Sequence, residues 1–521
     1  SRAARPATLG GRPGVVCRRM ARVQHREGYL GETQAAPAIR SGHLAFSESF
    51  VFGAATAAYQ IEGAASEDGR TPSIWDTFSH TPGSIADGAT GDVACDHYHL
   101  FREDVELMAS LGVQAYRFSI SMSRLFPEAT GPKNEAAVRF YDELIDLLVQ
   151  NNIQPWVTLS HWDLPAYVPG GWLCDIEGLK WLFWRYAQSC FGRWGFKVKH
   201  WITLNEPWCC AVLGYGTGKF APGRSSSPGT EPYLAAHNML LIHAHVADIF
   251  KKEYAGFMGG QIGIVLNAEW KQPLNKDSVD AVAAAQRVMD FQLGWFADPI
   301  YFGEYPMSMR ETLRTRLPVF SEKDRKMIQG SSDFFGLNSY SSSYVVGRSA
   351  GETDAGYFAD VGVKETHDPA WERTDMDWAI VPWGLRELLL YVQRRYNPSG
   401  GIAITENGCA HEPPESAELD MRPGALKPRP HRAELTEPSE EEDEDTFEDT
   451  ERVRFFKAHL SAVHAAKASG ADVKAYFAWS LLDNFEWSHG YGRRFGIVRV
   501  DFRTQRRTVK ASGRFMQQVI K

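Results

Sequence analysis

Residues 401–408 read Gly-Ile-Ala-Ile-Thr-Glu-Asn-Gly, a short apolar run that ends in a carboxylate, an amide and a glycine. The run is too short for a buried helix and contains β-branched residues, so it predicts a buried strand. Residues 200–207, His-Trp-Ile-Thr-Leu-Asn-Glu-Pro, repeat the pattern, and the proline ends the strand. Two predicted strands therefore each carry a glutamate at the C-terminal end, Glu406 and Glu206.

Strand-like and helix-like stretches alternate along the rest of the chain, which is typical of a parallel sheet covered by helices. Amphipathic runs at Leu100–Leu111, Ala136–Asn151, Lys180–Phe191 and Val453–Ala468 are examples of the helices. The expected strands are Phe50–Ala54, Ala115–Ser119, Gln154–Leu159, His200–Leu204, Gln261–Leu266, Asp333–Leu337, Ile402–Thr405 and Ala475–Trp479. Eight such units predict an α/β fold, a single (β/α)8 barrel of the TIM type, with the active site at the C-terminal ends of the strands.

Length and composition fit one large domain. The 521 residues could also hold two or three ordinary domains, but barrels of this kind often exceed the usual domain size. An apolar fraction of 44% can fill a large core. A net charge of −8 without a basic stripe argues against a nucleic-acid partner, and no apolar run is long enough to span a membrane.

Two segments depart from the barrel pattern. Residues 1–42 are rich in Arg and Ala and poor in acids, and we expect a disordered leader. A cytoplasmic location is the favoured interpretation, with organelle targeting by this leader as the alternative. Residues 411 to about 451 form a Pro- and Glu-rich insertion with six consecutive acids at 440–445, which predicts an acidic surface loop within the domain at 43–521. Near the C-terminus, 495–502 and 507–509 predict a β-hairpin.

Paired carboxylates at strand ends suit glycoside hydrolysis. One carboxyl protonates the departing oxygen while the other meets the positive charge at the anomeric carbon. Residues 203–207, Thr-Leu-Asn-Glu-Pro, and 404–408, Ile-Thr-Glu-Asn-Gly, resemble the acid/base and nucleophile signatures of glycoside hydrolase family one, the β-glucosidase family. The resemblance extends from about Phe50 to the C-terminus. A retaining mechanism would place the two carboxyl groups about 5 Å apart.

The resemblance also implies roles for other residues. It makes Glu206 and Glu406 catalytic, and Arg117 and Tyr340 the residues that support Glu406 as the nucleophile. Trp479 would lie under the sugar ring, and Trp378 would form the wall on the leaving-group side. The complete set of implied substrate-binding residues is Gln60, His161, Asn205, Asn338, Tyr340, Trp378, Trp479, Glu486, Trp487 and Phe495. Met122 departs from the family, which usually has Trp there, and this predicts a change in packing rather than a loss of activity.

Other motifs carry little weight. The seven cysteines are scattered and predict no disulfide framework. The glycines of residues 214–219 have the wrong spacing for a nucleotide-binding loop. His97 with His99, and His243 with His245, lack an acidic zinc motif nearby and are interpreted as structural. We therefore expect no metal and no cofactor.

The sequence thus predicts a retaining β-glycosidase that removes terminal non-reducing β-D-glucosyl residues by double displacement, with galactosyl and fucosyl residues as further candidates. The partner is a small-molecule β-glycoside or oligosaccharide, and the oligomeric state is not predicted. The alternatives are a transglycosidase, a 6-phospho-β-glycosidase, and a non-catalytic sugar-binding module on the same barrel. Both carboxylates are present, which argues against the non-catalytic module.

Overall fold

A computed structural model describes residues 45–348, 355–411 and 449–521. The predicted leader at 1–42 and most of the predicted acidic insertion lie outside the described residues, so both interpretations stay predictions. Among the helices described, none is long and apolar enough to cross a membrane.

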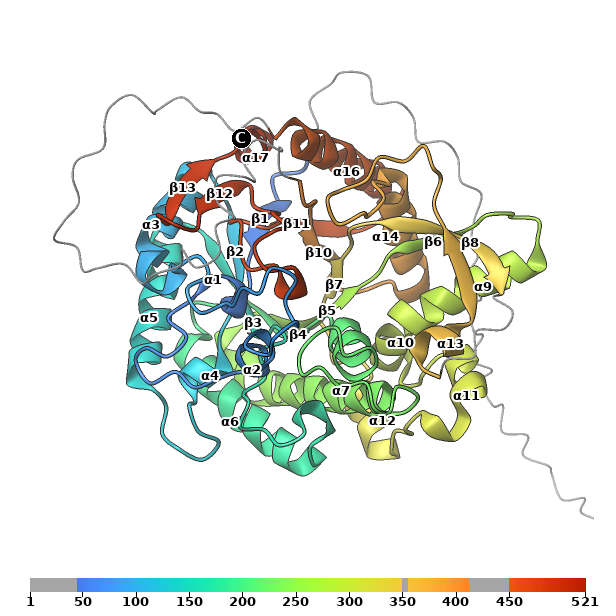
Figure 1. Ribbon diagram of the computed structural model, residues 1–521, viewed down its shortest axis with the longest axis horizontal. Helices are drawn as coiled ribbons and strands as arrows, with labels where there is room; N and C mark the ends of the chain where they lie inside the picture. Colours follow the sequence, from blue (N-terminus) through green and yellow to red (C-terminus); the bar gives the residue numbers. More distant parts are fainter. Residues whose placement is uncertain (1–44, 349–354, 412–448) are drawn as a thin grey trace, which may run out of the picture.

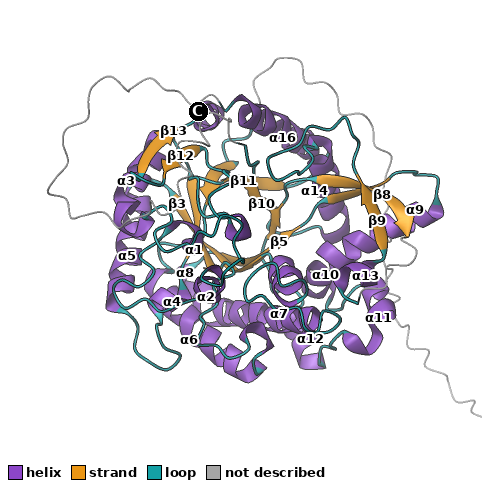
Figure 2. Ribbon diagram, in the orientation of Figure 1, coloured by secondary structure: helices purple, strands orange, loops and turns teal. Residues whose placement is uncertain are grey.

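Eight parallel strands close into a barrel at the centre of the molecule (Figures 1 and 2). Their order around the barrel is β1-β11-β10-β7-β5-β4-β3-β2. Their bounds are β1 Val51–Ala55, β2 Ala115–Ser119, β3 Gln154–Ser160, β4 His200–Asn205, β5 Gln261–Asn267, β7 Phe335–Asn338, β10 Ile402–Asn407 and β11 Val473–Trp479. Each of the eight overlaps its predicted range, with bounds that differ by at most two residues, and the predicted (β/α)8 barrel is confirmed.

The barrel is a packed core, because side chains from its strands fill the interior. Gly53 on β1 shows how tightly: a Cβ atom there would lie 2.4 Å from the ring of Phe477 and 2.6 Å from the carbonyl oxygen of Ala115. Trp156 on β3 stacks on His200 of β4 with ring centroids 3.8 Å apart. Such packing fixes the strand positions, and with them the side chains at the upper ends.

Helices surround the barrel. The long helices are α3 His97–Ser110, α5 Glu135–Gln150, α6 Ile176–Trp194, α7 Glu231–Ile249, α9 Val279–Met289, α14 Pro382–Tyr396, α16 Thr450–Ala468 and α17 Ala511–Ile520. The shorter α-helices are α1 Ala58–Ile61, α2 Ile74–Ser79, α4 Met122–Leu125, α8 Ala255–Met258, α10 Trp295–Phe302, α11 Met307–Leu313, α12 Glu322–Ile328 and α13 Tyr357–Val361. Single turns of other helix types are η1 Gly171–Leu173, η2 Cys209–Gly214, η3 Phe250–Tyr254, η4 Asp290–Gly294, η5 Arg314–Arg316 and η6 Trp487–His489.

Two small sheets lie outside the barrel. The predicted hairpin near the C-terminus is confirmed as the antiparallel pair β12 Val498–Asp501 and β13 Arg506–Val509. A three-stranded sheet was not predicted: β8 Ser342–Arg348 pairs with β6 Trp270–Pro273 and with β9 Val363–Thr366. It lies at the right of the barrel in Figure 1, beside α9.

The chain on either side of the predicted insertion is well anchored. Nε2 of His411 lies 3.2 Å from Oε2 of Glu451, so the two flanks lie side by side. Asp449 is buried and accepts hydrogen bonds from Arg452 and Ser512. The last residues of the predicted range, 449–451, therefore belong to the packed domain.

Candidate active site

A cavity of about 1260 Å³ opens at the C-terminal ends of the barrel strands. Ten of the predicted site residues line it: His161, Glu206, Asn338, Tyr340, Trp378, Glu406, Trp479, Glu486, Trp487 and Phe495. The remaining three, Gln60, Arg117 and Asn205, are buried and contact these residues from behind. The structure thus brings the whole predicted set together.

Glu406, near the end of β10, is held on both carboxylate oxygens. The buried guanidinium of Arg117 donates through Nη1 to Oε1, and the hydroxyl of Tyr340 donates to Oε2 at 2.6 Å. Both partners are donors to this carboxylate, and one is a full positive charge. The two donors fix the orientation of the Glu406 carboxylate toward the cavity.

Glu206 follows β4 in a left-handed backbone conformation, with φ of 43°. Such a conformation is costly for a residue with a side chain and tends to occur at functional sites. Oε1 accepts a hydrogen bond from Nδ2 of Asn338 at 2.6 Å, and Oε2 lies 3.0 Å from Sγ of Cys209. Burial, assisted by the negative charge of Glu406, raises the pKa of Glu206 to about 7. Glu206 is therefore suited to hold a proton in mildly acidic solution.

Asn205 links the two carboxylates through a chain of hydrogen bonds. Its Oδ1 accepts from Nη2 of Arg117 at 2.7 Å and from Nδ2 of Asn338 at 3.1 Å. Its Nδ2 lies 2.9 Å from Nε2 of His161. Burial lowers the pKa of His161 well below its usual value, so this ring is neutral and accepts at Nε2. The proton of His161 is then on Nδ1, which has no protein partner among the described residues.

At one end of the cavity, polar and aromatic side chains lie together in the pattern of a sugar site. Nε2 of Gln60 donates to Oδ1 of Asn484 at 3.0 Å and lies 3.4 Å from Oε2 of Glu486. Burial, together with the charge of Glu406, raises the pKa of Glu486 to about 8. Trp479 and Trp487 each stack with His161, with centroids 5.8 and 5.9 Å apart. Such surroundings offer flat apolar faces and hydroxyl partners side by side.

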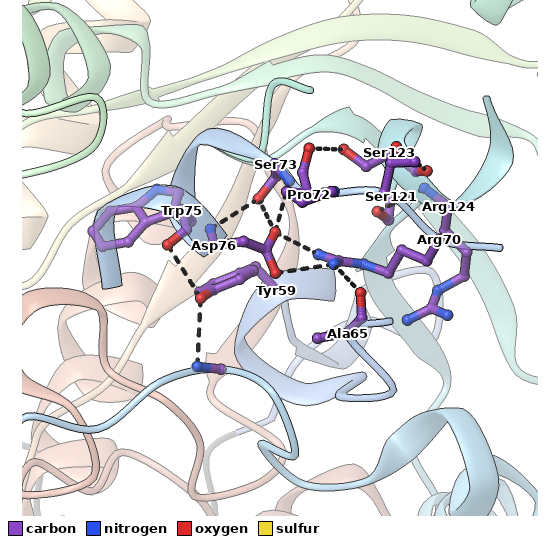
Figure 3. A network of polar contacts seen from close by, with 12 residues as sticks. Tyr59, Ala65, Arg70, Pro72, Ser73, Trp75, Asp76, Ser121, Ser123 and Arg124 are labelled. Atoms are coloured by element: carbon purple, nitrogen blue, oxygen red, sulfur yellow. Dashed lines mark hydrogen bonds and ion pairs between the residues drawn. The ribbon is translucent and has the colours of Figure 1, made fainter. Parts of the chain in front are cut away.

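The α2 segment supports this end of the cavity. Arg70 forms two hydrogen bonds with Asp76 at 2.9 and 2.8 Å, and Asp76 also accepts from Ser73 in a capping box (Figure 3). Trp75, on the same helix, packs against Trp487 with centroids 4.6 Å apart. The ion pair therefore holds the helix that supports Trp487.

The opposite wall comes from the unpredicted β6-β8-β9 sheet. Nζ of Lys271 is buried between Glu269 at 2.9 Å and Glu365 at 2.7 Å, and all three residues line the cavity. The sequence signal was weak, since Lys271 and Glu365 are far apart in the chain. Cys209 was also missed, although it stands three residues after Glu206, where a helical turn brings it back to the carboxyl.

Two further predictions concern residues outside the catalytic pair. Met122 is buried at the start of α4, as expected for a packing residue. The histidines considered as metal ligands have structural partners: His97 pairs with Asp104 at 2.8 Å, and His243 contacts Thr203 and Ser331. No cluster of His, Cys, Asp and Glu suited to a metal occurs in the ranges that the structure covers.

Comparison with known proteins agrees with this site. The family model for glycosyl hydrolase family 1 matches residues 43–421 and 435–521. Beta-glucosidase 4 of Oryza sativa subsp. japonica is 45% identical over 491 residues, covering 91% of this chain and 95% of the relative. Beta-glucosidase 42 of Arabidopsis thaliana is 44% identical over 473 residues, covering 88% and 90%.

Solved structures give the same result. A rice beta-glucosidase mutant in a covalent complex with Glc is similar with a TM-score of 0.83 at 40% identity, covering 91% of this chain and 98% of that one. A beta-glucosidase from the fungus Humicola insolens in complex with glucose has a TM-score of 0.81 at 37% identity, covering 90% and 97%. The chain belongs to glycosyl hydrolase family 1.

Proposed function

We propose that this protein is a retaining β-glucosidase in which Glu406 is the nucleophile and Glu206 is the acid/base. The observation that carries the assignment is the contrast between the two carboxyls. Glu406 receives hydrogen bonds from a guanidinium and a phenol, whereas Glu206 is buried with a pKa raised to about 7. One carboxyl is thus prepared to attack and the other to give a proton.

In the first step, an oxygen of Glu406 attacks the anomeric carbon and the bond to the leaving-group oxygen breaks. The electron pair of that bond stays on the leaving oxygen, which takes the proton of Glu206. Tyr340 and Arg117 keep the nucleophile oriented until attack. The products of this step are a glycosyl ester on Glu406 and a free alcohol or phenol.

In the second step, Glu206 is a carboxylate and takes a proton from water. The oxygen of that water attacks the anomeric carbon, and the bond to Glu406 breaks with its electron pair returning to the carboxylate. Esterification has removed the negative charge of Glu406, one of the two causes that raise the pKa of Glu206. The same side chain therefore becomes an acid or a base according to the charge beside it.

The sugar is bound by the polar and aromatic end of the cavity. Gln60 and Glu486 bind distal hydroxyls, and His161 offers its free Nδ1 proton to a hydroxyl of the same ring. Asn205 binds the hydroxyl next to the anomeric carbon. Trp479 lies under the ring, Trp487 packs at its distal edge, and Trp378 with Phe495 borders the leaving group, their rings being 6.0 Å apart.

The alternatives are less well supported. A 6-phospho-glycoside would place a dianion beside the buried carboxyl of Glu486, whose hydrogen-bond partner is the amide of Gln60 rather than a cation. A sugar-binding module has no need for two carboxylates with contrasting environments. Transglycosylation uses the same residues and differs only in the acceptor.

The test is hydrolysis of 4-nitrophenyl β-D-glucoside followed by proton NMR at early times. β-Glucose as the first product supports the proposal, whereas α-glucose as the first product would exclude double displacement. The matching galactoside, fucoside and 6-phosphoglucoside measure the preference among sugars. Added alcohols compete with water and measure transglycosylation.

A further inference from the structure

The guanidinium of Arg117 can only donate hydrogen bonds, and this determines how the side-chain amides of Asn205 and Asn338 are oriented beside Glu206. Arg117 has no acceptor, so Nη2 must face the carbonyl oxygen of Asn205, at 2.7 Å. That oxygen in turn accepts from Nδ2 of Asn338. The hydroxyl of Thr405 completes the pattern, because it donates to Oδ1 of Asn338 at 2.7 Å. Nδ2 of Asn338 therefore points to Glu206 as a donor.

This orientation determines where Glu206 carries its proton. Oε1 already accepts the N–H group of Asn338 at 2.6 Å. A proton on Oε1 that pointed toward Asn338 would clash with the hydrogen of this N–H group. The proton of the neutral carboxyl is therefore on Oε2. The atom beside Oε2 is Sγ of Cys209, at 3.0 Å.

We propose that Cys209 is a positioning residue for the acid/base: its thiol holds the proton-bearing oxygen of Glu206 and adapts to both states of that oxygen. This inference rests on the proposed function. When Glu206 is ionised, the thiol donates to Oε2. When Glu206 is neutral, the sulfur is a weak acceptor that leaves the proton free for the leaving group.

Two properties of Cys209 suit this role. Burial, reinforced by the charge of Glu206, raises the pKa of the thiol well above its usual value, so the group stays neutral and adds no charge. A thiol is also a weaker hydrogen-bond partner than a hydroxyl, so it stabilises the carboxylate only modestly. The proton therefore stays on Glu206 until substrate is bound and can then be transferred to the leaving-group oxygen.

Other charged or titratable groups that act on Glu206 come from different elements and stay in place when Cys209 is changed. Glu406 on β10 favours the neutral form, and Arg117 on β2 favours the ionised form. Glu486, before η6, has a pKa raised to about 8 and is itself neutral below that pH. Tyr340 and Cys210 also face this region, as neutral groups. A change confined to position 209 therefore reports on the thiol.

The experiment compares the pH profiles of kcat/KM for wild type, Cys209→Ser and Cys209→Ala with phenyl β-D-glucoside, a substrate whose poor leaving group needs the acid. The serine hydroxyl donates more strongly to the carboxylate and should move the basic limb down by about half a pH unit. Alanine removes the donor and should move it up by a similar amount. Cys210→Ala, at the neighbouring buried thiol, is the control and should leave the limb in place.

A limb that stays at the wild-type position in both variants, or that moves in the same direction in both, would overturn the inference. A basic limb that is unchanged in Glu206→Gln would show that Glu206 is not the titrating group. That result would overturn the proposed acid/base instead. Infrared difference spectra of the wild type against Cys209→Ala give a readout that needs no catalysis. The S–H band should shift as Glu206 titrates, and a band that is constant with pH would contradict the contact.

Discussion

Nδ2 of Asn338 lies 2.6 Å from Oε1 of Glu206, and this contact connects the acid/base to the rest of the site. Asn338 is the last residue of β7, and its amide is oriented from both sides by Asn205 and Thr405. Through Asn205 the chain of hydrogen bonds reaches Arg117, which holds Glu406. The acid/base and the nucleophile are thus parts of one connected network.

The two glutamates should respond differently to truncation and azide. Glu406→Ala should lose at least about 10⁴-fold in kcat, and azide should restore turnover with formation of the α-glycosyl azide, because azide occupies the vacated face of the sugar. Glu206→Ala should lose about 10²- to 10⁴-fold, least with good leaving groups, and should form the β-azide. The anomers are distinguished by NMR. The same anomer from both variants would show that the roles are wrongly assigned.

The activity should have a bell-shaped pH dependence with a mildly acidic optimum. Glu206 must be protonated to start the reaction, and its pKa of about 7 places the basic limb of kcat/KM near neutrality. Because the two carboxyls interact, both limbs of the profile belong to the pair rather than to one residue. The profile of Glu206→Gln with an activated aryl glucoside is the check. A basic limb that persists unchanged in this variant would exclude Glu206 as the titrating acid.

Glu206→Gln should make the protein more stable at neutral pH. Well below pH 4.5 the carboxyl is protonated in both the folded and the unfolded chain, and its titration does not affect stability. Between pH 4.5 and about 7 the unfolded chain releases the proton while the folded chain keeps it, so ionisation favours unfolding. The variant avoids this cost, of order 1–3 kcal/mol at pH 7. Thermal unfolding at pH 4 and pH 7 measures it, and a gain in Tm that is equal at both pH values would contradict the explanation.

Deleting the acidic insertion should leave turnover of a small aryl glucoside essentially unchanged. The flanks meet where His411 contacts Glu451, so a short Gly-Ser linker in place of residues 413–447 can join them. The family model also passes over residues 422–434, between its two matched ranges. The measurements are kcat/KM, which reports turnover, and circular dichroism, which reports whether the deletion variant is folded. Abolished turnover in a folded deletion variant would show that the insertion contributes to the site.

The barrel could be predicted because its strands are mostly apolar runs, and several of them, such as β4 and β10, end in polar residues. The start of β7 differs for a physical reason: Asp333 was expected in the strand, but its carboxylate accepts the backbone N–H of Ile262, and β7 begins two residues later. The β6-β8-β9 sheet could not be predicted, because β6 and β9 have only four residues each and neither is a continuous apolar run. Lys271 resembles a surface residue in sequence, and only its contacts with Glu269 and Glu365 explain its burial.

The roles of individual site residues were predicted from the resemblance to glycoside hydrolase family one more than from the pattern of apolar and polar residues. Motif and position identified Glu206 and Glu406, but nothing in the sequence alone indicated that a thiol would contact the acid. That contact depends on the left-handed backbone at Glu206 and on the turn that follows it. Local backbone geometry of this kind is set by the packed barrel around it.

The most direct test of the nucleophile is to trap the covalent intermediate. A 2-deoxy-2-fluoro-β-D-glucoside with an activated leaving group forms the glycosyl enzyme, but the fluorine slows the second step. Peptide mapping by mass spectrometry should then find one added fluoroglucosyl group on the peptide that contains Glu406, and none in Glu406→Gln. A label on Glu206, or complete turnover of the reagent with no label, would contradict the account.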